Sequence, residues 1–175
     1  MKTPVLKVSQ IRGKGTHGLY FKQSPSKGVK ITGKGYESRK TLKSRIKTSK
    51  KLQKVIKEAT IGLLAGGATL GVEIVKYQGR YFLGINQRHL SSNKEVTEKT
   101  LKFVKDSLRK KKVLHGDLHF GNVRFFKGLA VAVDFDSDYA IFVGKKNVYY
   151  TVKNRLIKKV LRKGKGLVGQ SLFVF

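Results

Sequence analysis

Two aspartates and one asparagine stand at spacings that suit metal-assisted chemistry on a hydroxyl group. Asp117 and Asn122 lie five residues apart after a short apolar run, and Asp134 follows a second apolar run. A carboxylate can accept or orient the proton of an attacking hydroxyl. An amide oxygen and a second carboxylate can hold Mg²⁺ against nucleotide phosphates. We therefore expect Asp117, Asn122 and Asp134 to be catalytic, with Asn122 and Asp134 as the metal ligands.

The scarcity of acidic residues makes this group more informative. The chain has 10 Asp and Glu against 39 Lys and Arg, and four of the acids lie between residues 117 and 138. A cationic protein that gathers its few carboxylates is expected to use them on a ligand, and a divalent cation is the natural one. The alternative is that the aspartates cap turns at strand ends. The combination of His115-Gly116-Asp117 with Asn122 favours the catalytic interpretation.

Three glycines near the N-terminus, Gly13, Gly15 and Gly18, form a Gly-x-Gly-x-x-Gly pattern. Strand-like apolar residues flank it on both sides, whereas a dinucleotide-binding loop leads from a strand into a helix. Glycine lets the backbone approach phosphate oxygens and turn its amides toward them. We therefore expect a strand–loop–strand flap over nucleotide phosphates, with an ordinary hairpin turn as the alternative.

Over residues 5 to 138 the chain resembles the protein-kinase-like superfamily. The resemblance is carried by His115-Gly116-Asp117-Leu118-His119 with Asn122, and by Asp134-Phe135, which are similar to the catalytic and metal-binding loops of kinases. Within the superfamily this motif looks most like the aminoglycoside phosphotransferases, the lipopolysaccharide-core kinases and the atypical branches that include the RIO kinases. The resemblance implies ATP and Mg²⁺ as cofactors and Asp117 as the catalytic base.

The same resemblance implies a lysine on the third strand that contacts nucleotide phosphates, and a glutamate on the next helix that pairs with it. Lys30, which lies between two β-branched residues, is the candidate lysine, and Glu58 is the candidate glutamate. Lys22 and Glu37 are the competing choices. The non-functional interpretations are a solvated lysine on an edge strand and an ordinary surface ion pair.

Three departures from the kinase pattern concern regulation. Gly116 stands where many regulated protein kinases carry an arginine that binds a phosphorylated activation loop, so we expect no control of that kind. Asp136 replaces the glycine that usually follows Phe135, which adds negative charge near the metal ligands. The chain after Asp136 is too short for a large peptide-docking lobe. These features indicate a minimal, constitutively competent enzyme.

The segments between the motifs predict an α+β fold with two kinase-like lobes. Residues 1–90 should form an antiparallel-sheet N-lobe with the glycine-rich flap, and residues 91–175 a reduced, mainly helical C-lobe with the catalytic and metal-binding loops. Apolar patterning predicts strands over 5–8, 19–21, 28–31, 71–77 and 80–85, a short apolar run over 139–143, and helices from 52, over 95–112 and over 149–162. Residues 86–90 should form the hinge, and the basic segment 35–52 is either a loop or a helix.

The formal net charge of +29 predicts an acidic partner. Nucleic acid, an anionic membrane or glycolipid surface, and a polyanionic substrate all qualify. The basic C-terminal helix over 149–162 suits an anionic membrane surface. A core helix with a solvated basic face is an equally good interpretation.

The remaining composition places limits on location. The chain has no cysteine, which excludes disulfides and thiolate metal sites. No apolar stretch of a secretory signal follows Met1. The longest uncharged run, residues 59–72, is too short and too rich in glycine to cross a bilayer, so we expect no transmembrane segment. We expect a cytoplasmic protein, peripheral at a membrane if its basic helix binds one.

The sequence as a whole predicts an ATP-dependent kinase that transfers the γ-phosphate to a hydroxyl of an acidic acceptor, either a lipopolysaccharide-like glycolipid or a protein Ser/Thr. Two other classes compete with it. A basic nucleic-acid-binding module would explain the charge, although no recognition motif is present. A kinase-fold scaffold would bind nucleotide without transferring phosphate.

Overall fold

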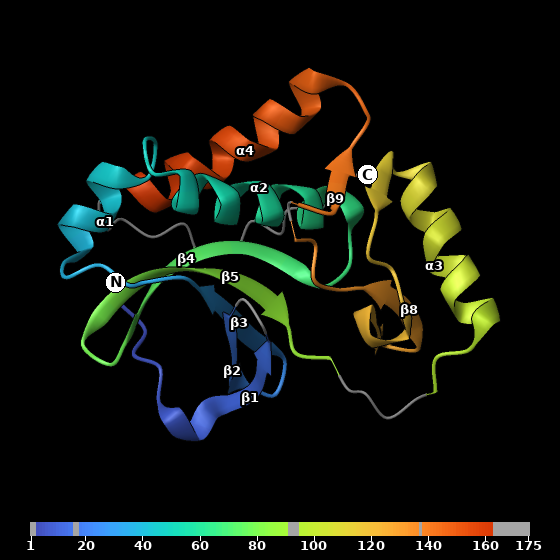
Figure 1. Ribbon diagram of the computed structural model, residues 1–175, viewed down its shortest axis with the longest axis horizontal. Helices are drawn as coiled ribbons and strands as arrows, with labels where there is room; N and C mark the ends of the chain where they lie inside the picture. Colours follow the sequence, from blue (N-terminus) through green and yellow to red (C-terminus); the bar gives the residue numbers. More distant parts are fainter. Residues whose placement is uncertain (1–2, 16–17, 91–94, 137, 163–175) are drawn as a thin grey trace.

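A computed structural model describes residues 3–15, 18–90, 95–136 and 138–162, and it has an α+β fold as predicted. Its largest element is a five-stranded antiparallel sheet with strand order β1-β2-β3-β5-β4 (Figure 1). The strands are β1 (Ile11–Gly15), β2 (Gly18–Ser24), β3 (Lys27–Thr32), β4 (Thr69–Tyr77) and β5 (Arg80–Arg88).

The strand predicted over residues 5–8 is wrong. Val5 makes only an isolated bridge to Lys76, and the chain then turns into a 3-10 helix, η1 (Val8–Gln10). The Gln10 side chain accepts a hydrogen bond of 2.8 Å from the backbone N–H of Lys7, and such local bonds compete with strand pairing. Leu6 is the residue of this segment that enters the core.

Two helices follow the third strand, one in the basic segment 35–52, for which the sequence left a choice between loop and helix, and one where a helix was predicted. The basic segment forms the short helix α1 (Arg39–Arg45), and α2 (Lys50–Ala65) begins two residues before the predicted start. Ser49 caps α2 by accepting a hydrogen bond from the N–H of Leu52. Gly66, at φ 65°, ends the helix in a conformation that favours glycine.

The predicted hairpin of β4 and β5 is confirmed. Gln78 and Gly79 both have positive φ at its turn, as the tight turns of two-residue hairpins require. The predicted hinge over 86–90 is partly wrong, because β5 continues to Arg88. Asn86 pairs with Val29 on β3, so the strand ladder extends into the predicted hinge.

The described residues after β5 form two α-helices, one 3-10 helix and four short strands. Two two-stranded sheets, β6–β9 and β7–β8, carry the loops that contain the aspartates. The predicted helix over 95–112 and the predicted apolar run over 139–143 are present with shorter bounds. The elements are α3 (Glu98–Lys110), β6 (Val113–His115), the 3-10 helix η2 (Phe120–Asn122), β7 (Val123–Phe126), β8 (Leu129–Ala132), β9 (Ala140–Phe142) and α4 (Lys146–Leu161).

Helix α2 connects the two parts of the core. Its Ile56 packs with the apolar residues of β4 and β5, whereas its Ile61 and Ala65 pack with Val104 and Phe135 from the second part. The opposite face of the sheet packs around Phe21. A side chain on α2 can therefore meet residues from both parts of the chain.

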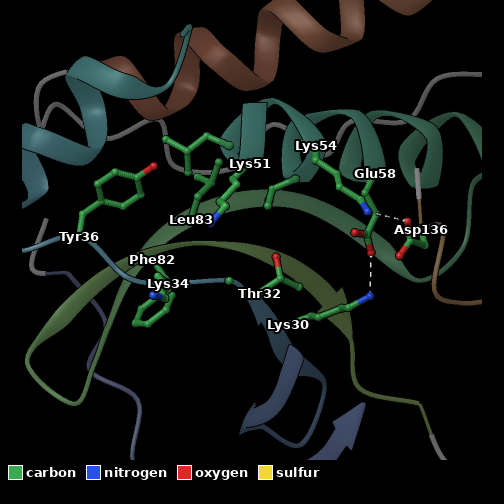
Figure 2. A pocket seen from close by; sticks show the side chains of 13 residues that line it. Lys30, Thr32, Lys34, Tyr36, Lys51, Lys54, Glu58, Phe82, Leu83 and Asp136 are labelled. Carbon is green, nitrogen blue, oxygen red and sulfur yellow. Dashed lines mark hydrogen bonds and ion pairs between the residues drawn. The ribbon is translucent and has the colours of Figure 1, made fainter. Parts of the chain in front are cut away.

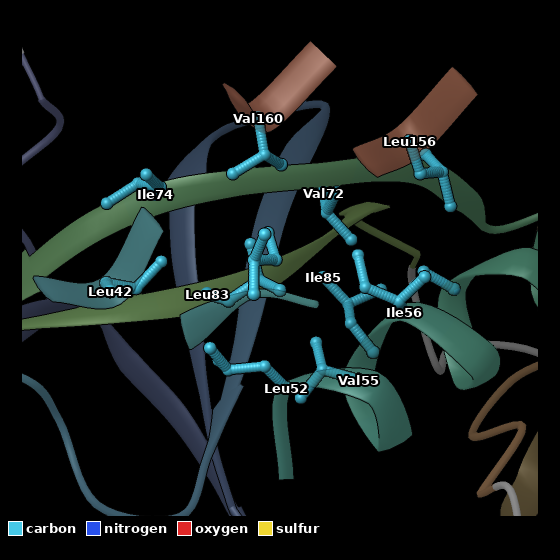
Figure 3. Packing of buried hydrophobic residues seen from close by; sticks show 12 residues of the cluster. Leu42, Leu52, Val55, Ile56, Val72, Ile74, Leu83, Ile85, Leu156 and Val160 are labelled. Carbon is cyan, nitrogen blue, oxygen red and sulfur yellow. The ribbon is translucent and has the colours of Figure 1, made fainter. Parts of the chain in front are cut away.

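The C-terminal helix α4 packs against α2 and β4, so its buried face completes the core of residues 1–90 (Figures 1 and 3). Leu156 and Val160 are its buried residues. Arg155, Lys158 and Lys159 are exposed, so the helix has both a core face and a basic face. Lys163 lies outside the described residues. Among the helices of the described ranges, none combines the length and apolar content needed to cross a bilayer.

Candidate active site

Lys30 is the centre of the candidate site. Its Nζ lies 2.9 Å from Oε1 of Glu58 on α2, and it also contacts Oδ1 of Asp134, which follows β8. Figure 2 shows the pairing of Lys30 with Glu58 between the sheet and α2. The predicted Lys30–Glu58 pair is thus present, and the contact with Asp134 brings the predicted lysine, glutamate and one metal ligand together.

The alternation of β3 explains why Lys30 faces α2. Val29 and Ile31 point to the opposite face of the sheet, where they pack with Phe21. Lys30 is left on the face that α2 covers. Glu58 lies on the buried side of α2, so the two charges meet in a water-poor space, with side chains 15% and 7% exposed respectively.

Burial and charge act against each other at this pair. Burial alone would lower the pKa of Lys30, but the carboxylates of Glu58 and Asp134 outweigh it and raise the pKa above its ordinary value. Burial raises the pKa of Glu58, and the Lys30 ammonium opposes that change. Lys30 is therefore held protonated, as a lysine that binds phosphate must be.

Asp134 has an unusual backbone conformation. Its φ is 58°, a left-handed value that costs a non-glycine residue about 1 kcal/mol or more. The neighbouring Phe135 is buried against the ring of His115, with centroids 5.0 Å apart. His115 Nε2 lies 3.0 Å from the carbonyl oxygen of Val133. These contacts fix both sides of Asp134 and aim its carboxylate at Lys30.

Asp117 and Asn122 are brought together on an exposed loop. The Nδ2 of Asn122 donates to the backbone oxygen of Asp117 at 2.8 Å and to its Oδ2 at 3.3 Å. The backbone N–H of Val133 donates to the carbonyl of Asn122 at 2.9 Å, which ties this loop to the segment that carries Asp134. The Asp117 side chain is 57% exposed and so is accessible to a ligand.

The donors at this site fit Mg²⁺. In the described residues, no group of three or more His, Asp and Glu side chains is arranged to hold a metal. Magnesium does not need such a group, because it is usually bound by one or two protein oxygens together with waters and substrate phosphates. Asn122 uses its amide nitrogen for Asp117, so its amide oxygen and the Asp134 carboxylate are the atoms that would ligate the ion.

The glycine pattern forms the predicted strand–loop–strand hairpin. Gly13 lies in β1 opposite Tyr20, and Gly15 pairs with Gly18 of β2 next to the turn. A Cβ at Gly18 would lie 2.4 Å from the carbonyl oxygen of Ile31, so packing on β3 already requires glycine there. A Cβ at Gly13 would meet no close atom. The phosphate-flap role stays a prediction, and the turn residues 16–17 lie outside the described residues.

The ion pairs of Lys54 were not predicted from the sequence. Its Nζ lies 3.5 Å from Oδ1 of Asp136 and 2.5 Å from Oδ2 of Asp138. Lys54 stands four residues before Glu58 on α2, so the helix contacts the segment after Asp134 directly through Lys54 and, one turn later, indirectly through the Glu58–Lys30–Asp134 contacts. The spacing to Glu58 was visible in the sequence, but its partners were not.

Replacing Lys54 with glutamine should change the pH dependence of stability. Burial acts to raise the pKa of Asp136, but the Asp138 amide and the Lys54 ammonium outweigh it and hold the pKa below its ordinary value of 3.8. A lowered carboxyl pKa stabilises the fold above the ordinary value, and this contribution is lost as the pH falls through the lowered one. The difference in unfolding free energy between wild type and Lys54→Gln should therefore shrink in acid.

Urea unfolding from pH 2 to 7 measures that difference. Lys50→Gln is the matched control, since Lys50 is exposed at the start of the same helix. If both variants give the same profile of stability against pH, Lys54 does not tie α2 to the aspartate segment.

Comparisons with known proteins add no family assignment. The chain matches no protein-family model, and no curated protein matches it significantly. The candidate site is therefore defined by the convergence of Lys30, Glu58 and Asp134 and by the neighbouring Asp117–Asn122 loop.

Proposed function

We propose that this protein is an ATP-dependent kinase that transfers the γ-phosphate to a hydroxyl group of an acidic acceptor. One observation carries the proposal. Lys30 contacts both Glu58 and Asp134, although the three residues come from a strand, a helix and a distant loop. Kinases hold a phosphate-binding lysine against a helix glutamate and place a metal-binding aspartate nearby.

The fold supports the same proposal. An antiparallel sheet with a helix on one face would correspond to the small lobe of a kinase, and the large lobe predicted over residues 91–175 would be reduced to the segment from α3 to β9, because α4 packs on α2 and β4. The hairpin of β1 and β2 would cover the nucleotide phosphates. The cofactors of this proposal are ATP and Mg²⁺, and the nucleotide would bind through Lys30 and through the backbone of Gly13, Gly15 and Gly18.

The residues of the site divide the proposed reaction among them, and Asn122 and Asp134 would hold the Mg²⁺ ion. Asp117 orients the acceptor hydroxyl and accepts its proton. The hydroxyl oxygen attacks the γ-phosphorus while the bond between the γ-phosphorus and the oxygen that bridges it to the β-phosphate breaks. Asn122 holds Asp117 in place through the bonds from its Nδ2. Lys30 neutralises charge on the phosphate oxygens and is itself held by Glu58. Bound Mg²⁺ supplies further neutralisation of phosphate charge.

The contacts of Lys54 support a kinase that is competent without activation-loop phosphorylation. In regulated kinases, new charge on that loop helps to position the helix glutamate. In this chain, Asp136 and Asp138 already carry negative charge and already contact Lys54 on α2. The fixed charge of Asp136 and Asp138 would therefore perform the task of a phosphate.

The net charge of +29 supports an acidic acceptor. The exposed basic face of α4 would hold the enzyme at an anionic membrane surface from the cytoplasmic side. This placement favours two classes of acceptor, a phosphorylated glycolipid of that membrane surface or an acidic protein with Ser/Thr hydroxyls.

A transfer assay with γ-labelled ATP tests the function. The purified protein and its Asp117→Ala variant are incubated with Mg²⁺ and labelled ATP, together with a cell lysate or its membrane fraction. We expect label in lipid, protein or small-molecule products with wild type alone, and the labelled fraction identifies the acceptor class. Equal label with both proteins would contradict the proposal. Steeply salt-dependent binding of nucleic acid without binding of Mg·ATP would favour the nucleic-acid module instead.

A further inference from the structure

A pocket of about 470 Å³ lies between the end of β3 and the first half of α2 (Figure 2). Thr32, Gly33 and Lys34 line it from the strand end, and Lys51 and Lys54 line it from the helix. Leu52, Val55, Phe82 and Leu83 also line it, so part of its wall is apolar. The pocket can therefore accept a group with both a polar and an apolar portion.

The charge of this pocket is strongly positive. Four lysines line it, Lys30, Lys34, Lys51 and Lys54, against two carboxylates, Glu58 and Asp136. The ion pairs that the described residues make here use Lys30 and Lys54, and none of them uses Lys34 or Lys51. Lys34 and Lys51 are exposed and line the pocket, Lys34 from the strand end and Lys51 from the helix.

The start of α2 adds to this positive potential. Lys51 and Leu52 belong to its first turn, which contains no acidic residue. A helix N-terminus carries partial positive charge and attracts anions. The hydroxyl of Tyr36, which lines the pocket, donates to the capping residue Ser49 at 3.2 Å. The pocket therefore combines two lysines without ion-pair partners in the described structure, a helix N-terminus and a fixed tyrosine.

The pocket adjoins the proposed nucleotide site through Lys30 and Glu58, and it extends from them toward the flap and away from the aspartate loops. Thr32 pairs with Gly18, so the pocket begins at the same end of the sheet as the turn of the β1–β2 hairpin. Asp117, Asn122 and Asp134 do not line it. A ligand in this pocket would lie beside the phosphate end of the proposed nucleotide site.

We propose that this pocket is a second anion site that binds the phosphate group of an organic phosphate or diphosphate. Lys34 and Lys51 bind the phosphate oxygens, and the apolar wall that includes Phe82 takes the attached organic portion. Binding here requires neither Asp117 nor phosphoryl transfer, so the site goes beyond the proposed kinase activity. The phosphate belongs either to the acceptor or to a free metabolite, and the two sources share this chemistry.

Titration of the protein with pyrophosphate in the presence of saturating Mg²⁺ and a non-hydrolysable ATP analogue tests the site. The double variant Lys34→Gln/Lys51→Gln should bind pyrophosphate about tenfold more weakly, which corresponds to the loss of two solvent-exposed charge contacts. Its affinity for the ATP analogue should not change. The control is Lys99→Gln/Lys102→Gln, which removes the same charge from exposed positions of α3.

Two results would overturn the proposal. Equal pyrophosphate affinity in both double variants would show that general charge is responsible, and binding of pyrophosphate only when the ATP analogue is left out would place it in the nucleotide site. The result of this titration does not depend on the kinase proposal, because Asp117→Ala should bind pyrophosphate like wild type. Phosphatase treatment of the membrane fraction then identifies the source, since it abolishes acceptance of label only if the acceptor supplies the phosphate.

Discussion

Asp117→Ala is expected to lower the rate of phosphate transfer by a factor of about 10²–10⁴, the usual contribution of a positioned general base. Its affinity for Mg·ATP should stay within about twofold of wild type. The reason is the position of Asp117 on an exposed loop, where its side chain contacts Asn122 and His119 and not Lys30. Single-turnover transfer and nucleotide titration measure the two quantities on the same protein.

Asp106→Asn is the matched control for this variant. Asp106 is an exposed aspartate on α3, away from the loop, so its replacement removes the same charge without touching the site. The control should transfer phosphate at the wild-type rate. Wild-type turnover by Asp117→Ala would refute the assignment of the whole Asp117–Asn122 loop.

Lys30→Met is expected to reduce both activity and stability. The variant leaves Glu58, which is 7% exposed, without its cation. Removing one partner of a buried ion pair costs about 3–5 kcal/mol of unfolding free energy, since the remaining charge is desolvated and uncompensated. Phosphate transfer and nucleotide affinity should both fall, because Lys30 is the proposed contact of the phosphates. Urea unfolding and nucleotide titration measure the two effects.

The double variant Lys30→Met/Glu58→Leu separates these effects. It removes both charges from the space between β3 and α2, so most of the lost stability should return. Activity should not return, because no cation remains for the phosphates. A double variant that regains stability and transfer together would show that Lys30 has only a structural role.

Much of the sheet could be predicted because its signals are local. The alternation around Lys30, the Gln78-Gly79 turn and the helical spacing before Glu58 each depend on a few neighbouring residues. The segment from Val5 to Val8 has the same strand-like composition, but the local bond from Lys7 to Gln10 prevails there. The end of β5 was missed because its pairing with β3 involves residues far away in the chain.

The candidate site, like the sheet, could be predicted from the sequence only in part. The order of Asp117, Asn122 and Asp134 could be read from the sequence, and so could the pairing of Lys30 with Glu58, because the kinase pattern specifies both. The contacts of Lys54 could not, since Asp138 lies 84 residues further along the chain. The pocket lined by Lys34 and Lys51 could not be predicted from the sequence either, because these lysines are two among 39 basic residues.

The packing of α4 has a consequence for the biosynthesis of the protein. The ribosome makes the sheet and α2 first, and Leu156 and Val160, which complete their core, are made only after the whole segment from α3 to β9. Nascent chains fold from the N-terminus, and contacts between distant segments form late. We therefore expect chains stalled before residue 146 to stay protease-sensitive around α2. The ion pair of Lys30 with Glu58 should then form stably only once α4 has been made.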